Sequence, residues 1–414
     1  MSGNRNPAAL AAYNAVRGAA VGGFQALLPM YMASLGYKMS EIGGSVALAS
    51  VAVALALPVT GLLIDTIGSR PVVAVAGSLL AAAALVAAAS SSIAPLTLAY
   101  ALFLASFLIG QPARMAFLAR SVEGERLGSY IGLTSTAFSA SRLAGPALAG
   151  AAAERVGYRP AFAALALAAL AGLAVFAALS TRPPLEGPPR TRPGLLEAYR
   201  RALRPPPGLA GVLGFVAVDR LGWALWFPTL TAYLYKRGFS ESDAGLVASA
   251  IGAANTLLLP ATGRAVDRLG AWAGVAASEA LGAAGILLLS GATALPWAAL
   301  AAAVVGASIS LWIPSYNSLV ARIVGPERLG EAYSSANSVR ALAGAPAPYL
   351  GGLAYDALGP AAPFHASAAV LTLAALAAAT LLRRVEASAR AAASAGPQPA
   401  LGRPAAPGGL APRR

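Results

Sequence analysis

The chain lacks several residue types on which many soluble enzymes depend. It contains no cysteine, which excludes disulfides, thiolate metal sites and a cysteine nucleophile. The single histidine, His365, excludes the histidine-rich zinc motifs. The lysines, Lys38 and Lys236, do not follow a glycine-rich phosphate loop, which argues against direct drive by ATP. We therefore expect no cofactor, no metal and no enzymatic activity.

Charge is also scarce. Only 11% of the 414 residues are charged and 57% are hydrophobic, whereas a soluble domain carries about 25% charged residues. A bilayer as the main solvent explains this composition, with its mean hydropathy of +0.67. The net charge of +14 comes from arginines spread along loops between apolar segments, a pattern that does not indicate nucleic-acid binding.

Apolar windows of about 20 residues are long enough to cross the hydrocarbon core. The sequence predicts twelve transmembrane helices, and hence an all-α polytopic membrane protein. They cover residues 9–35, 41–63, 71–91, 94–118, 128–152, 158–180, 209–235, 243–263, 271–291, 294–320, 330–354 and 361–382. Prolines fall inside several spans, where they are tolerated as kinks; these are Pro29, Pro58, Pro146, Pro228, Pro260, Pro314 and Pro346.

A short phrase occurs twice, which indicates two related halves. Gly61, Asp65 and Gly68 lie at the end of the second predicted span, and Gly263, Asp267 and Gly270 lie at the end of the eighth, each pair 202 positions apart. We predict an N-terminal six-helix bundle over 1–180, a linker over 181–208, a C-terminal six-helix bundle over 209–384 and a disordered tail over 385–414. Within the linker, residues 195–204 could form an amphipathic helix on the membrane surface or remain a solvated charged segment.

The distribution of basic residues predicts the orientation. With both termini in the cytoplasm, the outer loops hold only Lys38, Arg155, Arg159, Lys236 and Arg237 of the 30 basic residues, and most of the others are cytoplasmic. We expect a multi-pass protein of the bacterial or archaeal inner membrane.

Twelve spans, a six-plus-six repeat and the Gly-x-x-x-Asp-x-x-Gly phrase between spans 2 and 3 resemble the major facilitator superfamily, in particular bacterial drug/proton antiporters. The resemblance implies gating by the two repeated phrases. The gating residues would be Gly61, Asp65, Gly68, Arg70, Arg114, Gly263, Asp267, Arg268 and Gly270. Arg70 and Arg114 are the expected partners of Asp65, and Arg268 and Arg322 those of Asp267.

The match to the antiporters is incomplete. These proteins often carry an arginine in span 4, four residues before a glycine, but here Ser106 precedes Gly110. A Gly-Pro-rich span 5, typical of exporters, is only partly matched by residues 145–150. The missing arginine argues against proton coupling by that route, and residues 145–150 favour export.

Charges inside the spans mark a central site, because each one is costly in the bilayer and needs a partner or a water-filled cavity. The resemblance places spans 1, 4, 7 and 10 around that site, with spans 2, 5, 8 and 11 beside them. The predicted cavity residues are Asn14, Arg17, Gln25, Arg142, Asp219, Arg220, Trp223, Trp226, Asn255, Tyr316, Asn317, Asn337 and Arg340.

The buried charges allow two interpretations. The arginines either recognise an anionic group or are neutralised internally, with Arg17 or Arg220 on Asp219 and backbone carbonyls on Arg142 and Arg340. Asp219 is either a titrating coupling group or a permanent ion-pair partner. Glu279 lies on span 9, a peripheral helix in this architecture, and is expected to have a structural role.

The sequence thus predicts a secondary transporter that works by alternating access. The first hypothesis is efflux of amphipathic, drug-like molecules coupled to protons. The second is transport of organic anions through the intramembrane arginines. A hypothesis of another class is a non-transporting receptor or a lipid-modifying protein. The expected partners are a small-molecule substrate, protons and membrane lipids; nucleic acid is not expected, and the protein is predicted to be a monomer.

Overall fold

A computed structural model describes residues 5–122, 126–185, 208–324 and 328–394. Within these ranges the chain is almost entirely helical and has no β-strand, so the predicted all-α fold is confirmed. The linker residues 186–207, which include the expected amphipathic segment 195–204, lie outside the described residues. The side chains of residues 55–62, among them Pro58 and Gly61, also lie outside the described part.

The N-terminal half consists of six long helices. They are α1 (Arg5–Ser34), α2 (Met39–Ile67), α3 (Ser69–Ala89), α4 (Ile93–Ser121), α5 (Leu127–Val156) and α6 (Tyr158–Leu179). Each one coincides with a predicted span. Gly68, with a φ of 91°, joins α2 to α3 in a backbone conformation that favours glycine.

The C-terminal half contains six further helical segments, three of them interrupted. They are α8 (Ala210–Ala224) with η2 (Phe227–Thr229) and α9 (Leu230–Lys236); α10 (Glu241–Leu269); α11 (Ala271–Gly291); α12 (Leu295–Val324); α13 (Leu329–Gly344) with α14 (Ala347–Leu358); and α15 (Ala362–Ala377) with the π-helical η4 (Ala378–Leu382) and α16 (Arg383–Ser394). Gly270 repeats the φ of 91° between α10 and α11.

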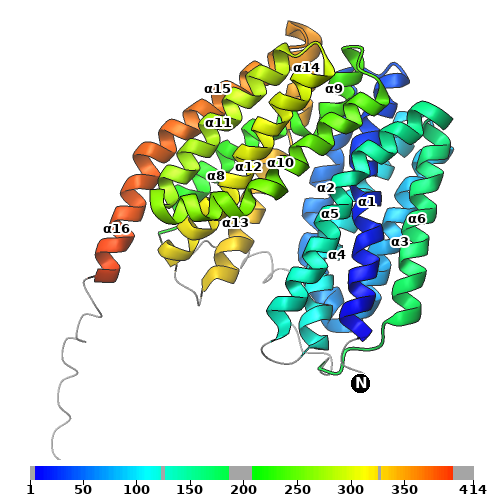
Figure 1. Cartoon of the computed structure of the whole chain (residues 1–414), viewed down its shortest axis with the longest axis horizontal. Helices are drawn as coiled ribbons and strands as arrows, with labels where there is room; N and C mark the ends of the chain where they lie inside the picture. The colour runs from blue at the N-terminus through cyan, green and yellow to red at the C-terminus, as the bar shows by residue number, and fades with distance from the viewer. Residues whose placement is uncertain (1–4, 123–125, 186–207, 325–327, 395–414) are drawn as a thin grey trace, which may run out of the picture.

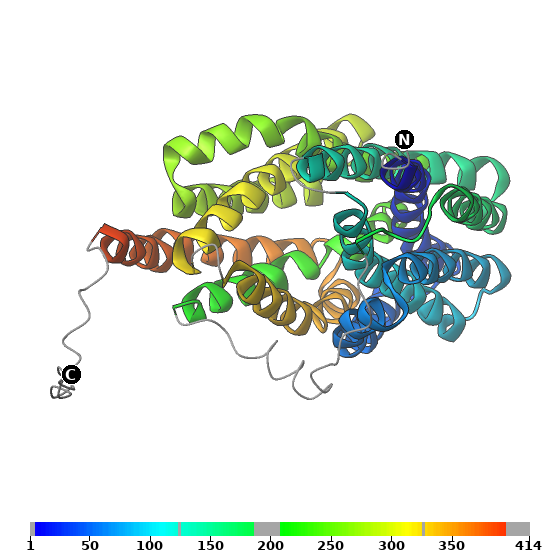
Figure 2. The same cartoon turned by 90° about the horizontal axis from the view of Figure 1, so that it is seen from below.

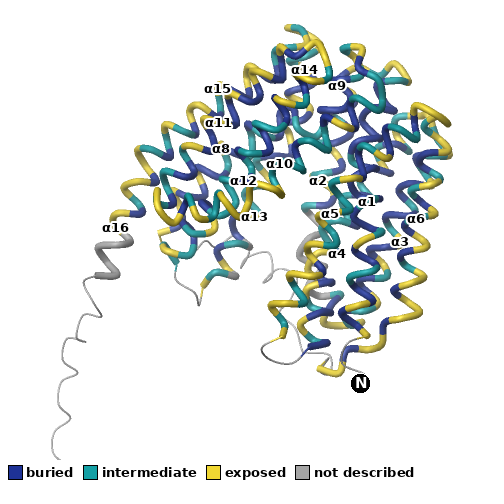
Figure 3. Tube along the Cα trace, viewed as in Figure 1, coloured by how far each residue is buried: buried dark blue, intermediate teal, exposed yellow. Residues whose placement is uncertain are grey.

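Eight of the described segments are long and apolar enough to cross a membrane, and the remaining predicted spans coincide with α1, α2, α5 and the pair α13–α14. Large leucines are exposed, such as Leu257 at 77% and Leu167 at 67%, and Figure 3 shows exposed and buried stretches alternating along the helices. Apolar outer faces suit contact with lipid.

Pro29, Pro146, Pro260 and Pro314 lie inside continuous helices, and the segment α8–α9 breaks next to Pro228. One prediction needs adjustment: α16 continues to Ser394, so the predicted disorder from residue 385 is wrong for its first ten positions (385–394).

The two halves meet on one side of the molecule. In Figure 1 they approach each other at the top and diverge toward the bottom, where the N-terminus lies. Figure 2, seen from below, shows the two groups of helices side by side. We call the side with the start of α1 the N-terminal side and the opposite one the far side.

Glycines allow backbone contact between the halves on the far side. A Cβ on Gly245 of α10 would overlap the carbonyl oxygen of Pro146 on α5, and a Cβ on Gly43 of α2 would overlap that of Pro348 on α14. Small residues let helix backbones approach closely in lipid. The far side is therefore closed by α5 against α10 and by α2 against α14.

Two carboxylates cross this contact and cap helices of the opposite half. Glu154 of α5 accepts a hydrogen bond from the backbone N–H of Ser242, at the start of α10, at 3.0 Å. Asp356 of α14 accepts from the N–H groups of Met39 and Ser40, at the start of α2, at 3.1 and 2.8 Å. Helix N-termini leave such N–H groups without intrahelical partners and favour negative charge.

These two caps occupy equivalent places in the two halves. Asp356 follows Glu154 by 202 positions, which is the offset of the repeated phrase, and Ser242 follows Ser40 by the same number. Each half thus supplies one carboxylate and one helix start. We call Glu154 and Asp356, with the N–H groups they bind, the reciprocal caps.

Removal of the reciprocal caps is expected to loosen the far side. In the double variant Glu154→Gln, Asp356→Asn, the hydrogen bonds to α10 and α2 lose their charge assistance. We expect the population that is open on the far side to rise several-fold. Because the chain has no cysteine, cysteines introduced at the exposed Leu35 and Leu358 can be spin-labelled, and their distance distribution should gain a longer component.

Glu41→Gln is the matched control. Glu41 bonds the backbone N–H of Lys38 at 2.7 Å and therefore caps its own helix without crossing to the other half. A distance distribution that changes equally in the control and in the double variant would show that the reciprocal caps do not hold the far side closed.

Candidate functional site

A cavity of about 340 Å³ lies between the halves, on the N-terminal side of the closed contact. The N-terminal half contributes residues of α1 and α5, and the C-terminal half contributes residues of η2, α9, α10 and α12. The polar side chains that line it are Gln25, Ser139, Arg142, Thr231, Asn255 and Thr256. A mostly apolar cavity with a few fixed polar groups is typical of small-molecule sites.

Arg142 is the charged residue in this lining. Its Nη2 donates to Oε1 of Gln25 at 2.8 Å, and its guanidinium lies over the ring of Phe107 at 5.7 Å. Across the cavity, Oδ1 of Asn255 is buried and has no hydrogen-bond partner. Gln25, Arg142 and Asn255 were predicted to share a cavity, and they do. The expected backbone-carbonyl partner of Arg142 is replaced by Gln25.

A smaller cavity of about 150 Å³ adjoins the first in the C-terminal half. It is lined by Asp219, Arg220, Trp223, Phe227, Ile309, Trp312 and Arg340. Phe227 and Ile309 also line the larger cavity, so the two spaces share a wall. Neither of these two residues was predicted, because an apolar side chain on an apolar helix gives no signal in the sequence.

Asp219 is almost completely buried, at 1% exposure, and pairs with Arg340 at a distance of 4.0 Å. The guanidinium of Arg340 lies over the ring of Trp312 at 4.5 Å, and Trp312 stacks on Tyr316. The internal partner expected for Asp219 was Arg17 or Arg220. The ion pair is made instead from α13, which packs against α8.

Arg17 lies inside the N-terminal half, away from both cavities. Its Nη2 donates to the carbonyl and hydroxyl oxygens of Ser106 on α4, at 3.0 and 3.3 Å. Arg114, which was predicted to partner Asp65, is buried beside it; the two guanidinium groups lie over the ring of Phe138 at 5.6 and 5.3 Å. The sequence did not predict this pair of buried arginines.

Other predicted cavity residues also lie elsewhere. Asn14 donates to the carbonyl oxygen of Thr134, and Trp226 is buried in the core against Phe364. Asn317 accepts a hydrogen bond from Tyr333, and Asn337 is exposed. Neither Asn317 nor Asn337 lines one of the two cavities.

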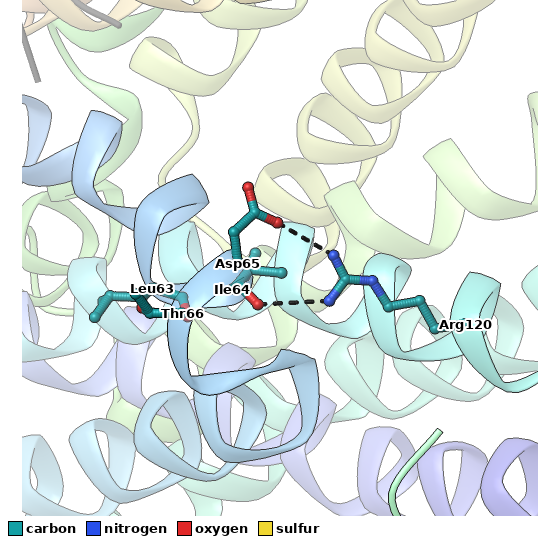
Figure 4. Close-up of polar contacts among 5 residues, drawn as sticks. All are labelled: Leu63, Ile64, Asp65, Thr66 and Arg120. Atoms are coloured by element: carbon teal, nitrogen blue, oxygen red, sulfur yellow. Dashed lines mark hydrogen bonds and ion pairs between the residues drawn. The ribbon is translucent and has the colours of Figure 1, made fainter. Parts of the chain in front are cut away.

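The repeated phrase forms one ion pair in the N-terminal half. Arg120 of α4 donates to Oδ1 of Asp65 at 3.2 Å and to the carbonyl oxygen of Ile64 at 3.4 Å (Figure 4). Arg70 instead bonds Ser180 and the carbonyl oxygen of Ala177 at the end of α6. The predicted partners Arg70 and Arg114 are therefore corrected to Arg120.

The second phrase is arranged differently. Arg322, 202 positions after Arg120, pairs with Glu386 of α16 at 2.8 Å. Asp267 and Arg268 are exposed, and within the described ranges no ion pair is made by either. A Cβ on Gly263 would meet no atom within 4 Å. Among the residues that the structure describes, no neighbouring helix therefore packs closely against this glycine in this conformation.

These two arginines give a stability prediction. Glu386 is buried to 2% side-chain exposure, whereas Asp65 is 44% exposed. Arg322→Ala should lower the unfolding free energy by about 1–3 kcal/mol, because a buried carboxylate loses a charged partner. Arg120→Ala should cost only about 0–1 kcal/mol, as for exposed pairs. Thermal unfolding in detergent measures both, and equal losses would contradict the prediction.

The fold of the chain closely matches that of solved transporters. A variant of peptide transporter POT in complex with alafosfalin superposes with a TM-score of 0.73 at 14% identity, over 92% of this chain and 95% of that one. A POT family transporter in complex with a thioalcohol-conjugated peptide gives a TM-score of 0.71 at 13% identity, over 92% and 96%. At such identities the likeness shows the fold alone.

No curated protein matches the sequence significantly. The family model described as Major Facilitator Superfamily matches residues 10–348 and 221–410. These matches together cover nearly the whole chain, and they agree with the paired helix bundles and with the cavity between them. The chain belongs to the Major Facilitator Superfamily and is a multi-pass membrane protein of the secondary-transporter type.

Proposed function

We propose that this transporter moves small amphipathic organic anions by alternating access, with protons as the coupling ion. The observation that supports this proposal is the charge of the two adjoining cavities. Arg142 lines the larger one, and Arg220 and Arg340 line the smaller one with Asp219 as the acid. Three guanidinium groups against one carboxylate leave the combined lining net positive.

Arginine suits this role because its planar guanidinium can bind a carboxylate or phosphate through two parallel hydrogen bonds. Arg142 is already oriented by Gln25, so less conformational freedom is lost when a ligand binds. The aromatic rings of Trp223, Phe227 and Trp312 offer apolar surface for the body of the ligand.

The closed far side supports the proposal of alternating access. The reciprocal caps and the glycine contacts block passage there, while the cavity lies on the N-terminal side of them. Exchange of this contact for one on the N-terminal side would expose the cavity to the other face of the membrane. In this scheme Asp65 and Arg120 belong to the surface that closes.

A small peptide is the second candidate substrate. Opposite charges stand on the lining, with Arg142 in one cavity and Asp219 in the other, and this arrangement suits a molecule that has a carboxylate at one end and an amine at the other. The structural neighbours that hold alafosfalin or a peptide make this candidate worth testing. Drug-like cations, the third candidate, suit the net positive lining less well.

We further propose a monomer in the inner membrane of a bacterium or archaeon, with both termini in the cytoplasm, in accordance with the distribution of basic residues. In that orientation the N-terminal side is cytoplasmic and the structure is open to the inside. An exporter would load its substrate in this conformation, whereas an importer would release it there.

Ligand binding tests the substrate class. We expect 2-naphthoate, an aromatic carboxylate, to raise the melting temperature of the detergent-purified protein, since a ligand that binds only the folded state stabilises it. Arg142→Gln should weaken this binding by about tenfold or more, equivalent to one lost charged hydrogen bond of about 1.5–3 kcal/mol.

Arg155→Gln is the control, because Arg155 is exposed near the far end of α5 and outside both linings. A dipeptide panel and a lipophilic cation such as tetraphenylphosphonium are measured in parallel. Stabilisation by the cation alone, unaffected by Arg142→Gln, would refute the anion proposal.

A further inference from the structure

Glu279 of α11 is a buried acid that the proposed substrate site does not use. The sequence predicts a peripheral helix and a structural role for it. In the structure its side chain is 1% exposed, and neither Oε1 nor Oε2 has a hydrogen-bond partner. A buried carboxylate without partners is strongly disfavoured in its ionised form.

The nearest acid is Asp219 of α8. Asp219 is equally buried, with Oδ2 also lacking a hydrogen bond, and its carboxyl group faces that of Glu279. A Cβ on Gly282, three residues after Glu279, would lie 3.1 Å from the ring of Trp223, four residues after Asp219, so α11 and α8 are in contact at this level. Two ionised carboxylates can only accept hydrogen bonds, so they repel. One proton turns one of them into a donor and joins the two groups.

The groups that face this pair come from three helices. Arg340 of α13 lies 4.0 Å from Asp219, and Arg220 and Trp223 of α8 also face Asp219. Trp312 of α12 faces Glu279, and Tyr316 of α12 faces Asp219 and Arg340. Arg220 and Arg340 both line the smaller cavity, but Arg220 packs along Gly344 and faces Tyr100 of α4, whereas Arg340 makes the ion pair with Asp219. Arg340 is therefore the cation placed between the acids and a bound ligand.

We propose that Asp219 and Glu279 together form a proton-binding site, and that Arg340, shared between this pair and the cavity, links proton binding to ligand binding. This inference deepens the proposed function. It rests on that function only for whether protons strengthen or weaken ligand binding. A proton from water in the cavity forms the O–H bond on one carboxyl group, which then donates to the other. On release the proton returns to that water.

The charges determine the sign. With one shared proton the pair carries one negative charge, which Arg340 balances. An anionic ligand that binds Arg340 neutralises part of its positive charge. The negative charge of the acid pair is then less compensated, so the pair binds a further proton more readily. Linkage requires the reverse as well, so protons must tighten the binding of anions. A cationic ligand near Asp219 would compete with protons instead, which is the arrangement needed for exchange.

The proton site can be tested without any ligand. Infrared difference spectroscopy of the purified protein during a pH titration records the C=O stretch of a protonated carboxyl group. We expect such a band, typical of a buried acid, at neutral pH, and we expect Glu279→Gln to remove or shift it. Glu331→Gln, which changes an exposed acid outside the cavities and the reciprocal caps, should leave it unchanged.

The link to ligand binding is tested with 2-naphthoate at about pH 6 and about pH 8. The wild-type protein should bind it more tightly at the lower pH, by at most about tenfold per pH unit for one linked proton. Glu279→Gln should keep binding but lose most of this pH dependence. Should this variant fail to fold, Asp219→Asn is measured with the same two readouts.

The outcomes separate the inference from the proposed function. A carboxyl band that survives both Glu279→Gln and Asp219→Asn overturns the proton site. A band lost in Glu279→Gln, together with binding of tetraphenylphosphonium that weakens at low pH, supports the proton site and refutes the anion proposal. Naphthoate binding whose pH dependence is unchanged in both variants overturns the link through Arg340.

Discussion

The reciprocal caps are the interaction on which the rest of this structure depends. Glu154 and Asp356 each satisfy the start of a helix in the opposite half, and the glycine contacts around them bring backbone against backbone. The N–H groups at a helix start need partners, so these bonds specify both where the halves meet and in which register. The cavity exists because the halves meet at the far side only, and its lining residues face each other for the same reason.

In the described part of the chain, the two halves have the same number of helical segments, but their buried charged residues differ. In the N-terminal half, Arg17 and Arg114 are buried beside Phe138, and their contacts are to neutral groups such as Ser106. In the C-terminal half, Asp219 is buried with Arg340, and Glu279 lies next to it. The same divergence occurs in the repeated phrase, where Arg120 pairs with Asp65 but Arg322 pairs with Glu386. The two halves thus share the glycine turns at Gly68 and Gly270 and the reciprocal caps, but they differ in their buried charges.

The sequence predicts helices well and helix faces poorly. Apolar length indicated the spans, and the glycines at 68 and 270 do occupy left-handed turns. A membrane helix can be apolar on every side, however, so periodicity does not reveal which side faces a cavity. Trp226 was expected in the site and lies in the core, whereas Glu279 was expected at the periphery and lies beside Asp219. The 202-residue offset relates Glu154 to Asp356, but it does not reveal which backbone groups of the opposite half these acids bind.

The wall shared by the two cavities has a consequence for energy conservation. Phe227 and Ile309 border both cavities. These two apolar side chains therefore lie between the acid pair Asp219 and Glu279 and the larger cavity. An apolar partition offers no hydrogen bonds along which protons could hop. Uncoupled leakage in the empty carrier would therefore be slow, and the stoichiometry of transport would depend on how a bound molecule hydrates or displaces these two side chains.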